Sequence, residues 1–375
     1  MVRSERIGAS MGRILTLYLF ILALVLPFAY TLLPFPGRMI CDLIEPYLND
    51  IGSWIIPDCL SCNWSISSDS AGLFLLALFI IPIAFLLEFI LAKTKSLPEL
   101  NTWKGLQFLL LLFLFMHLLR YGLDKVLLRQ FGAPEANLLF SPLGMMKKDM
   151  LFWSLMGSSP FYSVLTGCIE ALAAILMIIP RTRPMGLIMA TLIMAHVFLL
   201  NMSFEIDVLF FSGLLLSISL LLSWRIWSKV ISAVLGNSGK LDSAPAQKES
   251  TLVIKSTKAM LILAILADVL LPLITSESYQ SQKPIELKSA YQSHSKGMTK
   301  LFFHSTDHLI WQDEEAKFHT EKVIFNKNEG GFYLQDQGTF ISYTIHQDTL
   351  IIKGLIDASA LVFTAIDLKQ LPLLQ

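Results

Sequence analysis

The sequence predicts a polytopic α-helical membrane protein with about seven transmembrane helices and a small all-β domain at the C-terminal end of the chain. The first observation is compositional: of 375 residues, 54% are hydrophobic and only 15% are charged, whereas soluble domains carry about 25% charged residues. The second is that long apolar stretches recur up to residue 275. The third is that residues 276–375 alternate short β-favouring runs with turn residues instead.

Each membrane-spanning helix needs about 20 predominantly apolar residues. Seven stretches come close to this length, and they lie at 12–34, 72–93, 106–127, 160–180, 185–203, 207–227 and 258–275. The apolar part of the first stretch is longer than that of a signal peptide, and Pro34-Phe35-Pro36 follows it in place of a small-residue cleavage site. We therefore expect an uncleaved anchor.

The distribution of Lys and Arg predicts the orientation of these spans, because basic loops stay on the cytoplasmic side. Four segments on one side of a seven-span layout are basic, namely the N-terminus, the 94–105 loop, the Arg181–Arg183 turn and the 228–257 loop. The facing segments 35–71 and 204–206 are acidic or poor in basic residues, and 128–159 departs from the pattern with three basic residues. We expect a plasma (inner) membrane protein with a cytoplasmic N-terminus and an exoplasmic or periplasmic C-terminal domain.

These spans divide the chain into five parts. They are two N-terminal helices with an exoplasmic, cysteine-containing loop at 1–105, a four-helix bundle at 106–228, a polar cytoplasmic linker at 229–257, a seventh span at 258–275 and an exoplasmic β-rich domain at 276–375. In the last part the candidate strands are 299–303, 307–312, 320–326, 331–335, 339–345, 349–353 and 361–366, with hairpin turns at 328–331 and 336–338. So many short strands in so few residues indicate an antiparallel sandwich or barrel.

The segment Arg120-Tyr121-Gly122-Leu123-Asp124-Lys125 is the most informative in the chain, because charges of both signs follow an unbroken apolar run. Charges inside a membrane are costly, so they are kept where they face a protein interior, pair with each other or act chemically. At a rise of about 1.5 Å per residue, other polar residues reach the same depth. The residues expected to share one polar cavity in the outer half of the bundle are His117, Arg120, Tyr121, Asp124, Lys125, Glu170, His196, Asn201 and Asp207.

Two interpretations of this set are open. In the structural one, Arg120 pairs with Glu170 or Asp207, Asp124 pairs with a nearby lysine, and the charges only set the helix register. In the functional one, the residues form a cavity that binds a ligand, and clustering of costly groups favours it. Either way we expect Arg120 and Glu170 to interact or to share that cavity.

Two further groups of residues contain side chains that can bind metals or form disulfides. His117 and His196 could ligate a metal together with Glu170, but their spacing matches no metal signature, so the sequence predicts no metal and hydrogen-bonded histidines instead. Cys59 and Cys62 form a C-x-x-C pair near Cys41 in the exoplasmic loop, where thiols oxidise. We expect a disulfide among these three, either structural or redox-active, and a core position for Cys168.

Several function classes are excluded. The chain has no Walker loop, dinucleotide-binding glycine motif, nucleophile elbow or zincin motif. Its net charge is zero and it has no long basic stripe, so nucleic acid is not an expected partner. The expected partners are the lipid bilayer and a membrane or exoplasmic protein.

Residues 106–228 resemble the DoxX family of small four-helix membrane proteins. The resemblance is carried by residues 120–125 at the end of the first helix, by the Gly-x-x-Glu helix at 167–177 and by the basic turn at 181–183. The positions that match are Arg120, Gly122, Lys125, Gly167 and Glu170. The arrangement is also similar, more distantly, to the membrane part of vitamin K-dependent carboxylases.

This resemblance implies a quinone- or thiol-linked membrane oxidoreductase, or a subunit of one, with a quinone as the candidate cofactor. In that case Arg120, Glu170 and His196 would bind the head group or relay protons. The three further helices and the β-rich domain depart from the minimal family unit. The alternative is a non-enzymatic membrane module that binds a lipid or a partner protein through the β-rich domain.

Overall fold

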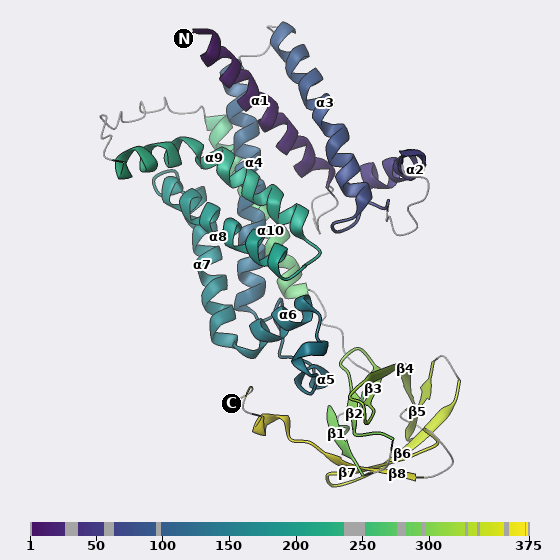
Figure 1. Ribbon diagram of the computed structural model, residues 1–375. Helices are drawn as coiled ribbons and strands as arrows, with labels where there is room; N and C mark the ends of the chain where they lie inside the picture. The colour runs from purple at the N-terminus through teal and green to yellow at the C-terminus, as the bar shows by residue number, and fades with distance from the viewer. Residues whose placement is uncertain are drawn as a thin grey trace. The chain divides into compact units, whose positions relative to one another are not determined.

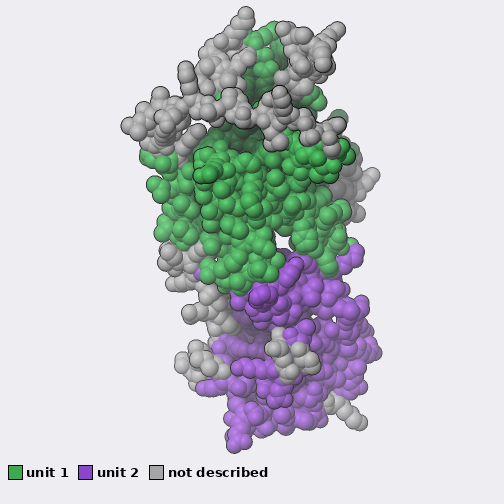
Figure 2. Space-filling view, turned by 90° about the vertical axis from the view of Figure 1, so that its left-hand side faces the viewer, with its two compact units in different colours: residues 1–127, 164–275 green, residues 128–163, 276–375 purple. Residues whose placement is uncertain are grey.

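The computed structural model describes residues 2–26, 37–55, 64–94, 99–235, 252–275, 283–284, 286–294, 297–326, 329–335, 338–355, 360–371 and 373. The chain forms two compact units, coloured separately in Figure 2. Unit 1 comprises residues 1–127 and 164–275, and unit 2 comprises residues 128–163 and 276–375. The sequence assigned 128–163 to the four-helix bundle, whereas the structure groups this segment with the β-rich domain.

Unit 1 is helical (Figure 1). Its helices are α1 (Val2–Val25), α2 (Gly37–Ile55), α3 (Ala71–Thr94), α4 (Glu99–Val126), α7 (Pro160–Ile178, which begins in unit 2), α8 (Arg183–Ser203), α9 (Leu209–Val234) and α10 (Leu252–Thr275). Among the described residues, α3, α4, α7, α8 and α9 are long and apolar enough to cross a membrane. The apolar described parts of α1 and α10, Ser10–Val25 and Ala259–Leu271, are shorter. The helices are those of a multi-pass membrane protein, and the count of seven spans stays a prediction.

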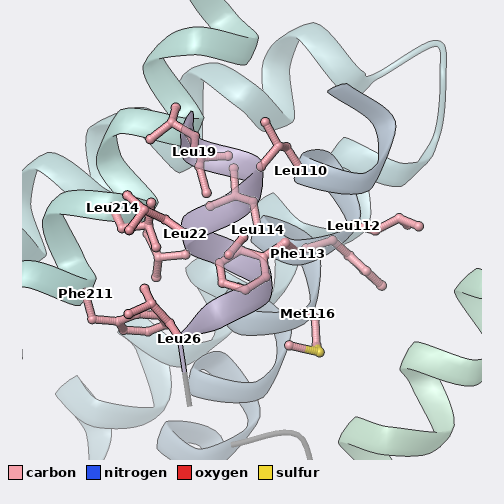
Figure 3. Packing of buried hydrophobic residues seen from close by; sticks show 14 of the residues in the cluster. Leu19, Leu22, Leu26, Leu110, Leu112, Phe113, Leu114, Met116, Phe211 and Leu214 are labelled. Carbon is pink, nitrogen blue, oxygen red and sulfur yellow. The ribbon is translucent and has the colours of Figure 1, made fainter. Parts of the chain in front are cut away.

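Helix α4 is at the centre of unit 1. Every residue from Leu110 to Leu119 is buried, so this helix is surrounded on all sides. Figure 3 shows leucines of α1 meeting leucines of α4 beside residues of α9; the side chains labelled there include Leu19, Leu22, Leu110, Leu114, Phe211 and Leu214. An unbroken apolar run fits this position, because a helix that is apolar all round is buried all round.

The turn before α3 ties the start of that helix to the start of α9. Asp69 accepts hydrogen bonds from the backbone amides of Leu209 (2.6 Å) and Phe210 (2.7 Å), across 140 residues of sequence. The next residue, Ser70, accepts a hydrogen bond from the amide of Leu73 in the first turn of α3. The first amides of a helix have no partner within the helix and carry partial positive charge, so a carboxylate there stabilises α9.

We expect Asp69→Ala to destabilise the protein by about 1–2 kcal/mol, because two amides of α9 lose their acceptor. Asp207→Ala is the matched control, since Asp207 is exposed two residues before α9. The free energy of unfolding can be measured by denaturant titration in mixed micelles. Equal effects of the two substitutions would show that the Asp69 contact does not stabilise α9.

Unit 2 contains a closed antiparallel β-barrel of eight strands in sequence order, in which the first strand pairs with the last. The strands are β1 (Ala290–Ser293), β2 (Lys300–Phe303), β3 (His308–Gln312), β4 (Phe318–Asn326), β5 (Gly331–Leu334), β6 (Phe340–His346), β7 (Thr349–Lys353) and β8 (Ala360–Ala365). All seven predicted strands are confirmed to within two residues, and β1 was missed because its four residues show little alternation. Closure pairs β1 with β8 and leaves no free edge.

The interior of the barrel is filled with apolar side chains. Leu301, Leu309, Phe332, Ile341 and Phe363 are each fully buried. Within a strand the core residues alternate, as Leu350 and Ile352 do in β7 and Leu361 and Phe363 in β8, as expected where one face of each strand points inward. The barrel is therefore a packed core, and any binding by this domain uses its outer surface.

The segment between α4 and α7 packs on the outside of the barrel. It forms α5 (Ala136–Leu139), η1 (Leu143–Met145) and α6 (Lys148–Ser158). Ala136 is buried against Phe302 and Ile310, and the Phe140 ring lies 5.8 Å from the Phe302 ring. The Ser305 hydroxyl donates to Glu135 at 2.5 Å. These contacts explain why 128–163 belongs with a domain that lies far away in the sequence.

Candidate functional site

Helices α4 and α7 approach each other so closely that their backbones touch. A Cβ atom at Gly122 would lie 2.8 Å from the Gly167 carbonyl oxygen, and one at Gly167 would lie 2.5 Å from the Gly122 carbonyl oxygen. Only glycine leaves room for such a contact, and small residues serve the same purpose where membrane helices cross. This crossing sets which side chains of α4 and α7 can meet.

An ion pair lies next to the crossing. Lys125 and Glu170 each follow their glycine by three residues, which is almost one helical turn. The Lys125 ammonium donates to Oε1 of Glu170, and both side chains are buried. Oε2 of Glu170 is also buried, and within the described part of the chain it has no hydrogen-bond partner. A buried acceptor oxygen without a donor is costly, and Oε2 of Glu88 is in the same situation.

Three more polar residues of α4, namely Arg120, Tyr121 and Asp124, lie near this ion pair. Together with Lys125 and Glu170 they form what we call the α4–α7 polar cluster. Tyr121 lies within electrostatic range of Arg120, Asp124 and Glu170. Arg120 and Asp124 are half-buried, and Tyr121 is 36% exposed on the surface of the bundle. The cluster thus runs from a buried ion pair to a face that would meet lipid.

Glu170 pairs with a different residue from the one named in the sequence analysis, while a cavity shared by Arg120 and Glu170 stays a prediction. The sequence favoured Arg120 and placed Lys125 at the mouth of a cavity, whereas the ion pair of Glu170 is with Lys125. The reason is geometric, because the glycine crossing aligns positions that lie equally far beyond Gly122 and Gly167. Depth in the membrane, on which the prediction relied, does not determine this alignment.

His117 precedes Tyr121 by one turn of α4; its ring lies 6.4 Å from the Tyr121 ring, and it is within electrostatic range of Arg120. Its side chain is buried, its Nδ1 is 2.9 Å from the Phe113 carbonyl oxygen, and its ring packs 5.0 Å from that of Phe211. It is close enough to Asp268 of α10 to interact electrostatically. Asp268 is fully buried and was not among the predicted residues. Asp268 is a charged residue in the apolar run 259–271. Because charges inside a membrane-spanning helix are costly, it could have been identified from the sequence in the same way as residues 120–125.

A second buried carboxylate, Glu88 of α3, was also missed. It forms an ion pair with Arg13 of α1 at 3.3 Å. The hydroxyl of Ser10 donates to the same carboxylate at 3.4 Å. Glu88 is an acidic residue inside the predicted span 72–93, so its position in the sequence already indicates a charge that needs a partner.

His196 and Asp207 do not join the cluster, because both are exposed. On α8 the buried positions include Ala190, Met194 and Asn201. His196 follows Met194 by two residues, a rotation of about 200°, and so points away from the interior. The structure therefore does not bring His196 and Asp207 to the α4–α7 polar cluster, and the shared cavity stays a prediction; Asn201 is buried. In the described residues no three His, Cys, Asp or Glu side chains come together to hold a metal ion.

The cysteines also differ from expectation. Cys41 of α2 is a free, buried thiol whose Sγ donates to the Val25 carbonyl at 3.1 Å. Burial, together with the carboxylates of Asp42 and Glu45, raises the pKa of this thiol to about 11, so it stays protonated and unreactive at neutral pH. Cys168 is exposed on α7 instead of lying in the core. Cys59 and Cys62 lie outside the described residues, and their disulfide stays a prediction.

We expect Gly122→Ala to destabilise the protein by about 1–3 kcal/mol, because the new methyl group forces α4 and α7 apart. Gly105→Ala is the matched control on the same helix, where a Cβ meets nothing within 4 Å. There the higher helix propensity of Ala should leave stability unchanged or raise it by up to about 1 kcal/mol. Thermal unfolding in detergent measures both, and a neutral Gly122→Ala would contradict the close crossing.

We expect Lys125 and Glu170 to be strongly coupled. Lys125→Met and Glu170→Met should each cost about 3–5 kcal/mol, because each leaves a buried charge, and the double variant should cost less than their sum. A second double-mutant cycle, made of Arg120→Met, Glu170→Met and the two combined, measures the coupling of Glu170 to Arg120 for comparison. Unfolding free energies in mixed micelles give both coupling energies, and a larger coupling for Arg120 would show that the pair is assigned wrongly.

The architecture and the cluster define the class of the protein: a multi-pass helical membrane protein with a buried lysine–glutamate pair and an eight-stranded β-barrel domain. Within this class, the chain belongs to the same family as the uncharacterized protein YwoB of Bacillus subtilis (strain 168). The two are 35% identical over 115 residues, which make up 30% of this chain and 71% of YwoB. No protein-family model and no solved structure matches the chain, so the DoxX resemblance stays an expectation.

Proposed function

We propose that the α4–α7 polar cluster binds the head group of a lipid-soluble quinone and that the chain is a quinone-linked membrane oxidoreductase or a subunit of one. The observation that carries this proposal is Oε2 of Glu170, a buried acceptor without a hydrogen-bond partner in the described residues, beside the Lys125 ammonium. A hydroxyl of a reduced head group would donate to that oxygen and remove the cost of leaving it unsatisfied.

The exposure of the cluster supports a ligand that arrives from the lipid. Tyr121 reaches the surface of the bundle, and its hydroxyl can donate or accept a hydrogen bond. An amphiphilic molecule could leave its apolar tail in the bilayer and place its polar end against Tyr121 and Glu170. Lys125 holds the Glu170 carboxylate in position, and the two carboxylates of the cluster, Asp124 and Glu170, can take up or release protons as the head group changes oxidation state.

The thiol-linked form of the proposal has fewer candidate residues than the sequence suggested. Cys41 is buried and its thiol remains protonated, so it does not supply a reactive thiolate. Thiol chemistry would therefore depend on the Cys59–Cys62 pair.

The test is mass spectrometry of the small molecules that co-purify with gently solubilised protein. We expect an isoprenoid quinone with the unmodified chain and at least about tenfold less with Glu170→Gln, since loss of one charge-assisted hydrogen bond costs about 1.5–3 kcal/mol. Asp207→Asn, an exposed carboxylate outside the cluster, should retain the quinone. Equal quinone content in all three proteins, or none when quinone is supplied, would refute the proposal.

The second candidate function is that of a non-enzymatic membrane module that binds a lipid or a partner protein through the barrel. It is favoured by the packed interior of the barrel together with outward apolar residues on two strands, Ile324 (49% exposed) and Val362 (39% exposed). Full function of Glu170→Gln in cells would favour this module over the oxidoreductase.

A further inference from the structure

Helix α2 (Gly37–Ile55) was not predicted, and it presents three different flanks. One flank is buried against the other helices of unit 1 through Cys41 and Leu48, and Gly52 is buried on the same flank. A polar flank carries Asp42 and Asn49, both exposed. Between them lies a third flank that is apolar and uncovered.

The third flank consists of four large side chains, which we call the α2 stripe. They are Leu43 (69% exposed), Tyr47 (63%), Ile51 (37%) and Trp54 (82%). Their spacing of four, four and three residues confines them to an arc of about 80°, at about 100° of rotation per residue. A contiguous exposed stripe of this kind marks a surface that is covered by something other than water.

We infer that α2 is an interfacial helix that lies in the plane of the membrane surface, with the α2 stripe embedded in the lipid. A helix of this type beside a membrane bundle must contact three environments at once: protein on one flank, acyl chains on another and water on a third. The three flanks of α2 match these environments, with the polar flank toward water. Tyr and Trp in the stripe are the residues that concentrate at membrane–water interfaces.

The place of α2 in the fold supports lipid as the occupant. Figure 1 shows α2 running crosswise to α3 at the end where α3 begins. From its first turns α3 exposes large apolar side chains, including Phe74 (45%) and Leu78 (62%), and α3 is one of the helices long and apolar enough to cross a membrane. The stripe thus lies on a helix that packs against the beginning of a candidate span. The Asp69 contact that joins the starts of α3 and α9 holds this end of the bundle together.

The position of Trp54 can be measured in the full chain after reconstitution in phosphatidylcholine vesicles. The protein has six other tryptophans, so the fluorescence of the Trp54→Phe variant is subtracted from that of the unmodified protein. The difference is the signal of Trp54. We expect vesicles of acyl-brominated phosphatidylcholine to quench this difference signal by about half or more, and aqueous acrylamide to quench it little, as for a ring at the acyl boundary. Trp311→Phe is the comparison, because Trp311 packs against the barrel core and stacks on His319, so brominated lipid should quench its signal less than that of Trp54.

Two further variants separate the flanks of the same helix. Leu43→Trp in the Trp54→Phe protein moves the probe along the stripe, and Asn49→Trp in the same protein moves it to the polar flank. Brominated lipid should quench the first and acrylamide the second. Quenching of both stripe probes by acrylamide alone would place the stripe in water. If neither agent quenches either stripe probe, then protein, such as a second copy of the chain, covers the stripe. Either result overturns the inference.

Discussion

The close contact between the α4 and α7 backbones at Gly122 and Gly167 is the constraint on which the candidate site depends. A single methyl group at either position would collide with the other helix. Because the helices touch there, side chains one turn further along are forced together, and a lysine and a glutamate occupy those places. The identity of the ion pair is therefore a consequence of steric fit between two backbones and does not follow from charge attraction alone.

Three buried carboxylates of the bundle lie close to a residue of another helix that is basic or can become charged. Lys125 of α4 meets Glu170 of α7, Arg13 of α1 meets Glu88 of α3, and Asp268 of α10 lies near His117. Since ionised groups in an apolar interior are expensive, each of these contacts restricts how its two helices can rotate and slide. The α4–α7 cluster differs from the other two in reaching the bundle surface through Tyr121. That difference is what makes it a candidate for a ligand that comes from the lipid.

The segments between long helices are structured parts of the protein. The stretch between α4 and α7 places Ala136 and Phe140 on the outside of the barrel, although these residues precede the first strand at Ala290 by about two fifths of the chain. The stretch between α1 and α3 forms α2, whose buried flank packs on unit 1 and whose apolar stripe is free for lipid. Helix α2 is as long as α7, but it carries too many charged residues to be counted among the candidate spans, whereas α5 and α6 are short.

The sequence by itself determined the helical membrane class, the approximate positions of α3, α4, α7, α8, α9 and α10, and seven of the eight strands, because apolar run length and alternation are local signals. It also identified Lys125 and Glu170 as members of one cluster. Only the tertiary structure decided that Lys125 pairs with Glu170, that His196 points outward, that Asp69 binds amides of α9, and that β1 closes the barrel against β8. These facts depend on helix rotation, crossing distance and pairing between distant segments, and no local period of the sequence encodes them.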